Sequence, residues 1–129
     1  MVYHANYLKY MERGRTETLR SMGYELDQLQ QHQDLIFAVT RADIRYKRPA
    51  LYNDLLEVDS QLQGAAGARL YFSQSIWRLD AQTKERQELL SDADIALAAI
   101  DGKGKPKRIP AELLQTLQQH LSHLRGDPA

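Results

Sequence analysis

The sequence contains no cysteine, and neither sign of charge is in excess, because 17 Lys and Arg residues balance 17 Asp and Glu residues. The lack of cysteine excludes a disulfide framework, a thiolate zinc site and a cysteine nucleophile. A general nucleic-acid-binding protein needs a basic surface that displaces counterions from phosphates. The balanced charge therefore argues against a nucleic-acid partner.

Long apolar runs are also missing. No run approaches the ~20 residues that a membrane-spanning helix requires. No charged and then apolar signal peptide opens the chain. The sequence therefore predicts no membrane span, and we expect a cytoplasmic protein.

What the sequence does contain is the composition of a globular protein, with 43% hydrophobic and 26% charged residues. A domain usually has ~100–200 residues, so a chain of this length has room for one. We expect residues 1–129 to form a single domain.

The hydrophobic pattern predicts a helix, four strands and a second helix. Apolar residues in 5–22 recur at the spacing of an amphipathic helix, and Gly23 suits the position just after its end. Alternation predicts strands over residues 35–47, 56–62, 69–80 and 87–101, and Pro110 opens the last helix at its first position. We interpret residues 25–34 as a polar connection and residues 64–67 as a hairpin turn.

Short connections between the strands predict an antiparallel meander with the long helix on one face, which is an α+β fold. Gly14 in mid-helix costs ~1 kcal/mol relative to alanine, so we expect the sheet to approach the helix closely there. A sheet of this size often needs a partner subunit, so we expect a homodimer. Strict alternation in the first strand would place on one face Ile36, Ala38, Thr40, Ala42, Ile44 and Tyr46.

The start of the first helix carries the residues most suggestive of chemistry, Tyr3, His4, Asn6 and Tyr7. A helix N-terminus offers unpaired N–H groups and a partial positive charge, and both stabilise a developing oxyanion. The same field disfavours a charged imidazole, so His4 would stay neutral and able to exchange a proton. On spacing alone, an exposed or capping histidine is the simpler interpretation.

Residues 2–17, VYHANYLKYMERGRTE, resemble the signature of the hot-dog-fold acyl-CoA thioesterases of the 4-hydroxybenzoyl-CoA thioesterase family. They look closest to its tol-pal system-associated branch. Two further segments are similar to the family, namely residues 45–50 (RYKRPA) followed by 54–58 (DLLEV), and residues 101–110 (DGKGKPKRIP). The resemblance covers nearly the whole chain.

This resemblance implies a hot-dog fold, in which an antiparallel sheet wraps a long central helix, and hydrolysis of an acyl-CoA thioester to a free acid and CoA. The active site would lie between two subunits at the N-terminus of that helix. N–H groups around Tyr3 and His4 would polarise the carbonyl, His4 would orient water or substrate, and Asn6 and Tyr7 would contact the substrate. No metal and no cofactor are implied, because CoA is part of the substrate.

The chain departs from the family pattern at its start. The family places a catalytic Asp in a D-x-D-x-x-G run just before Val-Tyr-His, whereas only Met1 precedes Val2 here. The first strand and this Asp are thus absent from the chain, and loss of a general base typically costs ~10²–10⁴-fold in rate. Met1 stands where the family commonly has a valine, and a GTG valine codon can be misread as a start codon. We therefore expect the natural protein to begin roughly 15–25 residues earlier, which is enough for one strand and a turn. The alternative is a true truncation, with an exposed sheet edge and an impaired enzyme.

Glu12 and several cations complete the candidate site. Glu12 either forms an ion pair with Arg15, three residues further along the helix, or lines the acyl pocket and helps to select the substrate. CoA carries phosphates, which need cationic side chains near the mouth of the pocket. We expect Arg69, Lys107 and Arg108 to bind them.

A second function stays open at this point. A chain without the catalytic Asp also suits a non-catalytic module that holds an acyl carrier protein or acts as an envelope-associated scaffold. Enoyl-CoA hydration needs a differently placed Asp and His pair, which the sequence does not show. The expected partners are an acyl-CoA substrate, further copies of the chain in a homodimer or homotetramer and, for the module, an acyl carrier protein.

Overall fold

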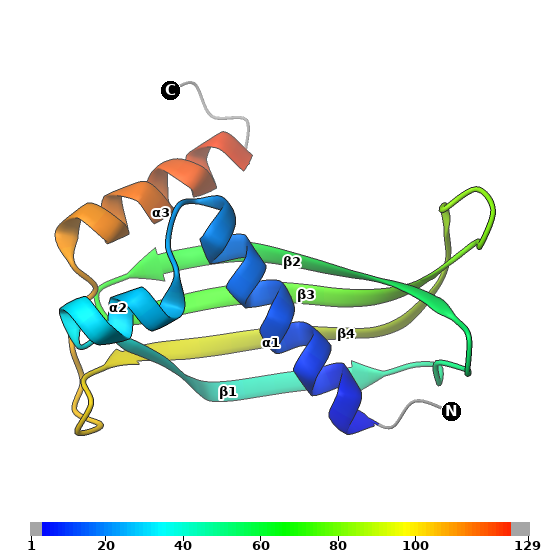
Figure 1. Ribbon diagram of the computed structural model, residues 1–129, viewed down its shortest axis with the longest axis horizontal. Coiled ribbons are helices and arrows are strands. Elements are labelled where there is room, and N and C mark those ends of the chain that lie inside the picture. The colour runs from blue at the N-terminus through cyan, green and yellow to red at the C-terminus, as the bar shows by residue number, and fades with distance from the viewer. Residues whose placement is uncertain (1–3, 125–129) are drawn as a thin grey trace.

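The computed structural model describes residues 4–124 of the chain, and the side chains of residues 7–121 (Figure 1). The elements follow in the order α1 (His4–Ser21), α2 (Leu26–Gln33), β1 (Ile36–Tyr46), β2 (Leu55–Ala66), β3 (Arg69–Leu79), β4 (Arg86–Ile100) and α3 (Ala111–Leu124). The predicted long helix, four strands and last helix are confirmed.

The helix α2 was not expected, because the sequence prediction treated residues 25–34 as a connection. Its eight residues, LDQLQQHQ, carry only two apolar side chains, so the amphipathic pattern is weak. Burial of Leu29 against the core and a left-handed residue at its C-terminal cap, Asp34, define the helix instead.

The four strands form one antiparallel sheet in the order β1-β4-β3-β2. The predicted meander is correct for β2, β3 and β4 but wrong for β1, which pairs with β4 rather than with β2. The chain therefore crosses from one edge of the sheet to the other through residues 47–54 (Figure 1). The hairpin turn between β2 and β3 is also shorter than expected, because residues 64–66 continue the strand.

A β-bulge interrupts the predicted alternation of β1. Its pairing register with β4 shifts between Val39 and Arg41, which makes Thr40 the extra residue. One inserted residue reverses the in–out alternation of a strand, so Phe37 and Val39 face α1. The predicted face is correct for Ala42, Ile44 and Tyr46, and wrong for Ile36 and Ala38.

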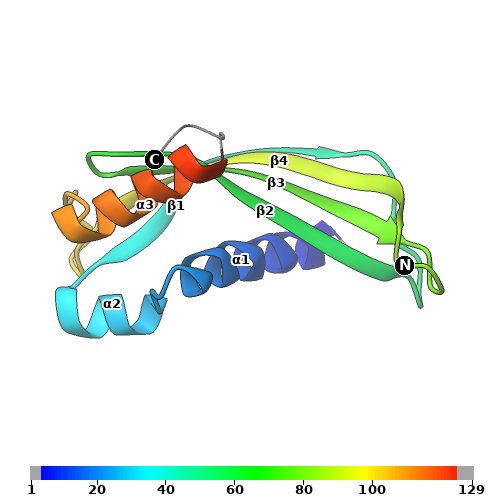
Figure 2. The same cartoon turned by 90° about the horizontal axis from the view of Figure 1, so that it is seen from above.

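The long helix α1 lies against one face of the sheet (Figure 2). The close approach predicted at Gly14 is confirmed, because a Cβ added there would lie 3.0 Å from Val58 Cγ1 and 3.2 Å from the Cβ of Ser60. Of the apolar residues whose spacing predicts this amphipathic helix, Met11 and Leu19 are buried, whereas Leu8 is 48% exposed. After the helix, Gly23 adopts the expected left-handed conformation with φ of 92°.

The last helix, α3, packs against β2 through the buried side chains of Leu113, Leu117 and Leu121. Its first hydrogen bond runs from Leu114 N–H to Pro110 O, over 2.9 Å, so Pro110 caps the helix one residue before the predicted position. Within the described residues, no helix is both long enough and apolar enough to cross a membrane.

Candidate active site

The N-terminal end of α1 is the predicted centre of the site. The helix begins at His4 and carries no acidic residue in its first turn. Its first N–H groups lack intrahelical acceptors and lie at the positive end of the helix dipole, so they can donate to a substrate carbonyl. Tyr3 lies outside the described residues, as do the side chains of His4 and Asn6. The roles expected of these three residues stay predictions.

Tyr7, one turn further on, is 1% exposed. Its hydroxyl donates to Arg48 O over 3.2 Å, and its ring stacks on Tyr46 with 5.9 Å between centroids. Burial raises the pKa of Tyr7, while a backbone hydrogen bond at Ala50 and the charge of Arg78 act in the opposite direction. Tyr7 thus anchors α1 to the loop of residues 47–54, and its predicted contact with substrate stays untested.

Glu12 lies at a hollow between α1 and β1, which we call the β1-side pocket. Its volume is about 300 Å³. Seven of its ten lining side chains are apolar, and Glu12 is one of the three that are polar. The lining residues are Glu12, Arg15, Thr16, Leu19, Leu26, Phe37, Val39, Leu70, Phe72 and Leu97. An apolar hollow with polar groups on α1 suits a hydrocarbon chain.

Arg15 forms no ion pair with Glu12 within the side chains that the structure describes. It donates instead to Oε1 of Gln74 over 2.9 Å. Gln74 is almost fully buried, and its Nε2 donates to Met11 O over 2.7 Å and to the Ser60 hydroxyl over 3.0 Å. Burial lowers the pKa of Arg15, and the charge of Glu12 opposes that shift. These hydrogen bonds of Gln74 fix the distance between α1 and the sheet.

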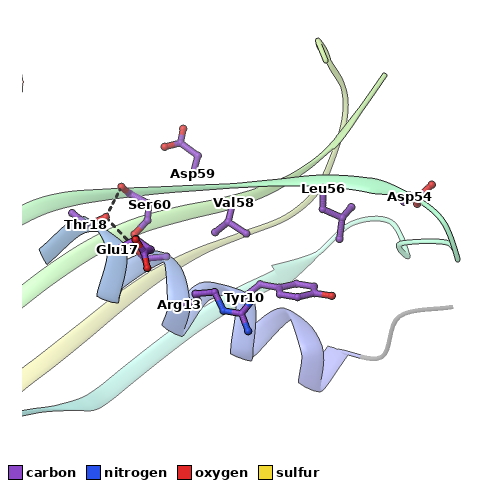
Figure 3. Close-up of a pocket in the computed structure, with 10 residues that line it drawn as sticks. Tyr10, Arg13, Glu17, Thr18, Asp54, Leu56, Val58, Asp59 and Ser60 are labelled. Atoms are coloured by element: carbon purple, nitrogen blue, oxygen red, sulfur yellow. Dashed lines mark hydrogen bonds between the residues drawn. The ribbon is translucent and has the colours of Figure 1, made fainter. Parts of the chain in front are cut away.

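A larger hollow of about 670 Å³, the β2-side cleft, lies on the other side of α1. In Figure 3, Leu56 and Val58 point from β2 toward the helix, and Tyr10 and Arg13 face them from α1. In the described chain β2 pairs only with β3, so the unpaired edge of β2 borders this cleft. Neither Tyr10 nor Arg13 was predicted from the sequence to line a cleft, because Arg13 is spaced with Lys9, Glu17 and Arg20 like a solvated helix face and Tyr10 carries no separate signal.

The three cations predicted to bind CoA phosphates lie at one end of the sheet. Arg69 begins β3, and residues 107–109 run beside the β2–β3 turn, with Ile109 N–H donating to Gly67 O over 2.9 Å. The side chains of Arg69 and Arg108 are exposed. Lys107 is already engaged, because its ammonium donates to Gln33 O and, over 3.2 Å, to Asp34 O at the end of α2.

These cations do not converge on His4 within one chain. α1 starts near the end of β1, where Tyr7 stacks on Tyr46, whereas the start of β3, which carries Arg69, and the loop before α3, which carries Arg108, lie at the other end of the sheet (Figure 1). A strand of the length of β3 spans roughly 35 Å at ~3.3 Å per residue. Within the described residues, no three His, Asp or Glu side chains gather as metal ligands would.

A long helix laid across an antiparallel sheet, with a hollow on each side of the helix, defines a hot-dog protein. The chain belongs to the thioesterase-like superfamily, whose family model matches residues 1–117.

Individual relatives agree with this family. Acyl-CoA thioesterase YbgC of Haemophilus influenzae is 36% identical over 114 residues, which cover 88% of this chain and 79% of the relative. Long-chain acyl-CoA thioesterase FadM of Escherichia coli is 31% identical over 119 residues, or 92% of this chain and 85% of that protein. The crystal structure of a probable thioesterase from Bartonella henselae matches with a TM-score of 0.73 and 35% identity, covering 84% of this chain and 85% of that one.

These matches confirm the predicted fold, the predicted family and the predicted class of enzyme, a thioesterase. The relative named YbgC fits the tol-pal-associated branch of the family.

Proposed function

We propose that this chain hydrolyses acyl-CoA thioesters at the N-terminal end of α1. Water adds to the thioester carbonyl, the carbon–sulfur bond breaks, and the products are a free carboxylic acid and CoA with its thiol. The names of the relatives in H. influenzae and E. coli support the acyl-CoA substrate. The observation that carries the proposal is that the opening motif forms most of α1, whose middle turns lie between two hollows.

The chemistry assigned to the helix end is electrostatic. Backbone N–H groups around Tyr3 and His4 would polarise the carbonyl and stabilise the oxyanion that forms as water attacks. His4 would orient the water or the substrate, with Asn6 beside it. The family motif places the general base, an Asp of a D-x-D-x-x-G run, just before Val-Tyr-His.

The acyl group would enter the β1-side pocket, because that hollow is mostly apolar, whereas Arg13, Glu17 and Asp54 line the β2-side cleft. Its volume of about 300 Å³ leaves room for an aliphatic chain of several carbons. Glu12, on α1, would lie beside the acyl chain of the substrate and help to select which acyl groups bind.

CoA would be shared between subunits. The start of β3 and the loop before α3, which carry Arg69 and Arg108, lie at the other end of the sheet from the start of α1 (Figure 1), so these cations would hold the phosphates of a CoA whose thioester lies at another subunit's helix. This separation supports a homodimer or homotetramer. Lys107 would contribute less than Arg108, since its ammonium is already bonded to α2. Acyl-CoA as the substrate also supports a cytoplasmic location. We propose no separate cofactor, because CoA is part of the substrate.

The second candidate is a non-catalytic module that binds an acyl carrier protein or an envelope-associated partner. A thiol-reactive dye separates the two functions, and the protein gives no background since it lacks cysteine. The enzyme releases CoA from acyl-CoA in proportion to protein concentration, whereas the module binds an acyl-CoA thioether analogue and releases no CoA.

A matched pair of variants tests the location of the acyl pocket. Val39→Trp fills the β1-side pocket from a side chain that is 48% exposed, and Arg13→Trp places the same ring in the β2-side cleft. Calorimetric titration with thioether analogues should show weaker binding of ten-carbon chains to the Val39 variant and unchanged binding of two-carbon chains. The opposite ranking of the two variants would move the acyl group to the β2-side cleft.

A further inference from the structure

Arg78 is the centre of an ion-pair network at the end of the sheet where α1 begins. It lies near the end of β3, on the face that Gln74 and Ile76 turn toward α1. Its Nε donates to Asp54 Oδ2 over 3.0 Å and its Nη2 to Pro49 O over 3.1 Å, while Nη1 pairs with Glu88. Its side chain is 21% exposed and that of Asp54 16%, so water screens this pair less than the ion pairs on the sheet surface.

These contacts fix the loop of residues 47–54, which crosses from one edge of the sheet to the other. Asp54 Oδ2 also accepts from Leu51 N–H over 2.6 Å, which closes the loop on itself. Arg48 pairs with Glu88 at 3.6 Å, so both flanks of the loop connect to the residues that Arg78 holds.

The same loop supports the first turns of α1. The Tyr7 hydroxyl donates to Arg48 O, and the Tyr7 ring stacks on Tyr46, just before the loop. Tyr7 follows His4 by three residues, or about 4.5 Å along a helix axis. A shift of the loop therefore also shifts the N-terminal end of α1.

We propose that Arg78 is a positioning residue that sets the orientation of the N-terminal end of α1 through the 47–54 loop. The inference rests on the proposed function, because it assigns to Arg78 the alignment of the helix N–H groups with the thioester carbonyl. The planar guanidinium matches the task, since it addresses Asp54, Glu88 and Pro49 O at once, which a lysine ammonium on a flexible stem does less well.

Arg86 provides the matched control. It also pairs with two carboxylates, Glu57 and Asp59, and lies 4.8 Å from the Trp77 ring centroid, but these contacts do not involve the loop or α1. Arg78→Met, Arg78→Lys and Arg86→Met should be compared for kcat and KM on an acyl-CoA and for amide hydrogen exchange at residues 8–11. Those amides bond to the carbonyls of residues 4–7 in a regular helix.

We expect Arg78→Met to lower kcat by about tenfold to a hundredfold, as small misplacements of catalytic groups do, while KM stays within about twofold. It should also accelerate exchange at residues 8–11. Arg78→Lys should recover part of both, and Arg86→Met should change neither. Equal effects of the two methionine variants, or unchanged exchange in Arg78→Met, would overturn the proposal. Wild-type protein that releases no CoA would instead contradict the proposed function, and the exchange data would still decide the role of Arg78.

Discussion

Tyr7 shows how one side chain connects the predicted catalytic end of α1 to the sheet. Tyr7→Phe removes the hydrogen bond to Arg48 O and should lower the free energy of unfolding by about 1 kcal/mol. Tyr71→Phe is the control, since Tyr71 is 43% exposed. Urea unfolding of both variants at neutral pH measures the difference.

The raised pKa of Tyr7 predicts an alkaline effect. Both states keep the phenol proton below pH 10.0, the ordinary value, and above it the unfolded chain releases the proton before the folded protein does. The contribution of Tyr7 to stability is thus complete below that pH and is lost as the pH rises through the higher folded pKa. Wild-type protein should lose more stability than Tyr7→Phe between pH 9 and 11, and parallel curves would contradict this.

Gly14 is the second residue whose role can be measured. Alanine there gains ~1 kcal/mol of helix propensity, but its Cβ would lie 3.0 Å from Val58 Cγ1, and overpacking costs about 1–3 kcal/mol. We expect a net loss of about 1 kcal/mol, whereas Lys9→Ala on the exposed face of α1 should change little. A Gly14→Ala protein that is more stable than the wild type would contradict this expectation and show that Val58 and Ser60 move to accommodate the added methyl group.

Residues within one local motif were predictable, and residues defined by contacts between distant segments were not. The positions of Gly14 and Glu12 on the first helix could be predicted, because helical periodicity and the opening signature both depend on residues that are neighbours in sequence. Arg78 could not, because its partners Asp54 and Glu88 come from a loop and another strand. No pattern in the sequence links these three residues before the sheet order is known.

At the scale of elements, Lys107 stabilises the C-terminal end of α2 through hydrogen bonds to its last carbonyl groups. Lys107→Met removes the donor to Gln33 O and Asp34 O, and should lower the free energy of unfolding by about 1–2 kcal/mol through the C-terminal end of α2. Lys105→Met, in the same loop, is the control. If the Lys107 variant keeps its stability and loses affinity for CoA, the phosphate role predicted from sequence is the correct one.

The elements that the sequence analysis missed share a physical cause. α2 is short and polar, so its formation depends on Leu29 and Lys107 rather than on its own pattern. The bulge at Thr40 and the pairing of β1 with β4 depend on partners far along the chain. The existence and approximate position of the four strands were predictable, whereas their order, the full length of β2 and the face of Ile36 and Ala38 were not.

At the scale of the whole molecule, the loop that carries Arg108 and the start of α1 lie at opposite ends of the sheet (Figure 1), which predicts active sites shared between subunits. In mixed oligomers of His4→Ala and Arg108→Gln, one site combines both intact residues. Random mixing should thus restore about a quarter of the wild-type rate at low acyl-CoA concentration. Each variant alone should stay well below that value. A mixture no faster than the mean of the two variants would place both residues in the same subunit's site, or remove Arg108 from it.

The most direct test of the central claim, thioester hydrolysis at the start of α1, is the rate of CoA release measured with a thiol-reactive dye. The proteins to compare are this chain, a form extended before Val2 by the D-x-D-x-x-G run, and the His4→Ala variant of the extended form. We predict that the extended form releases CoA and that His4→Ala lowers its kcat by about a hundredfold. No release by either form, or full activity without His4, would contradict the account.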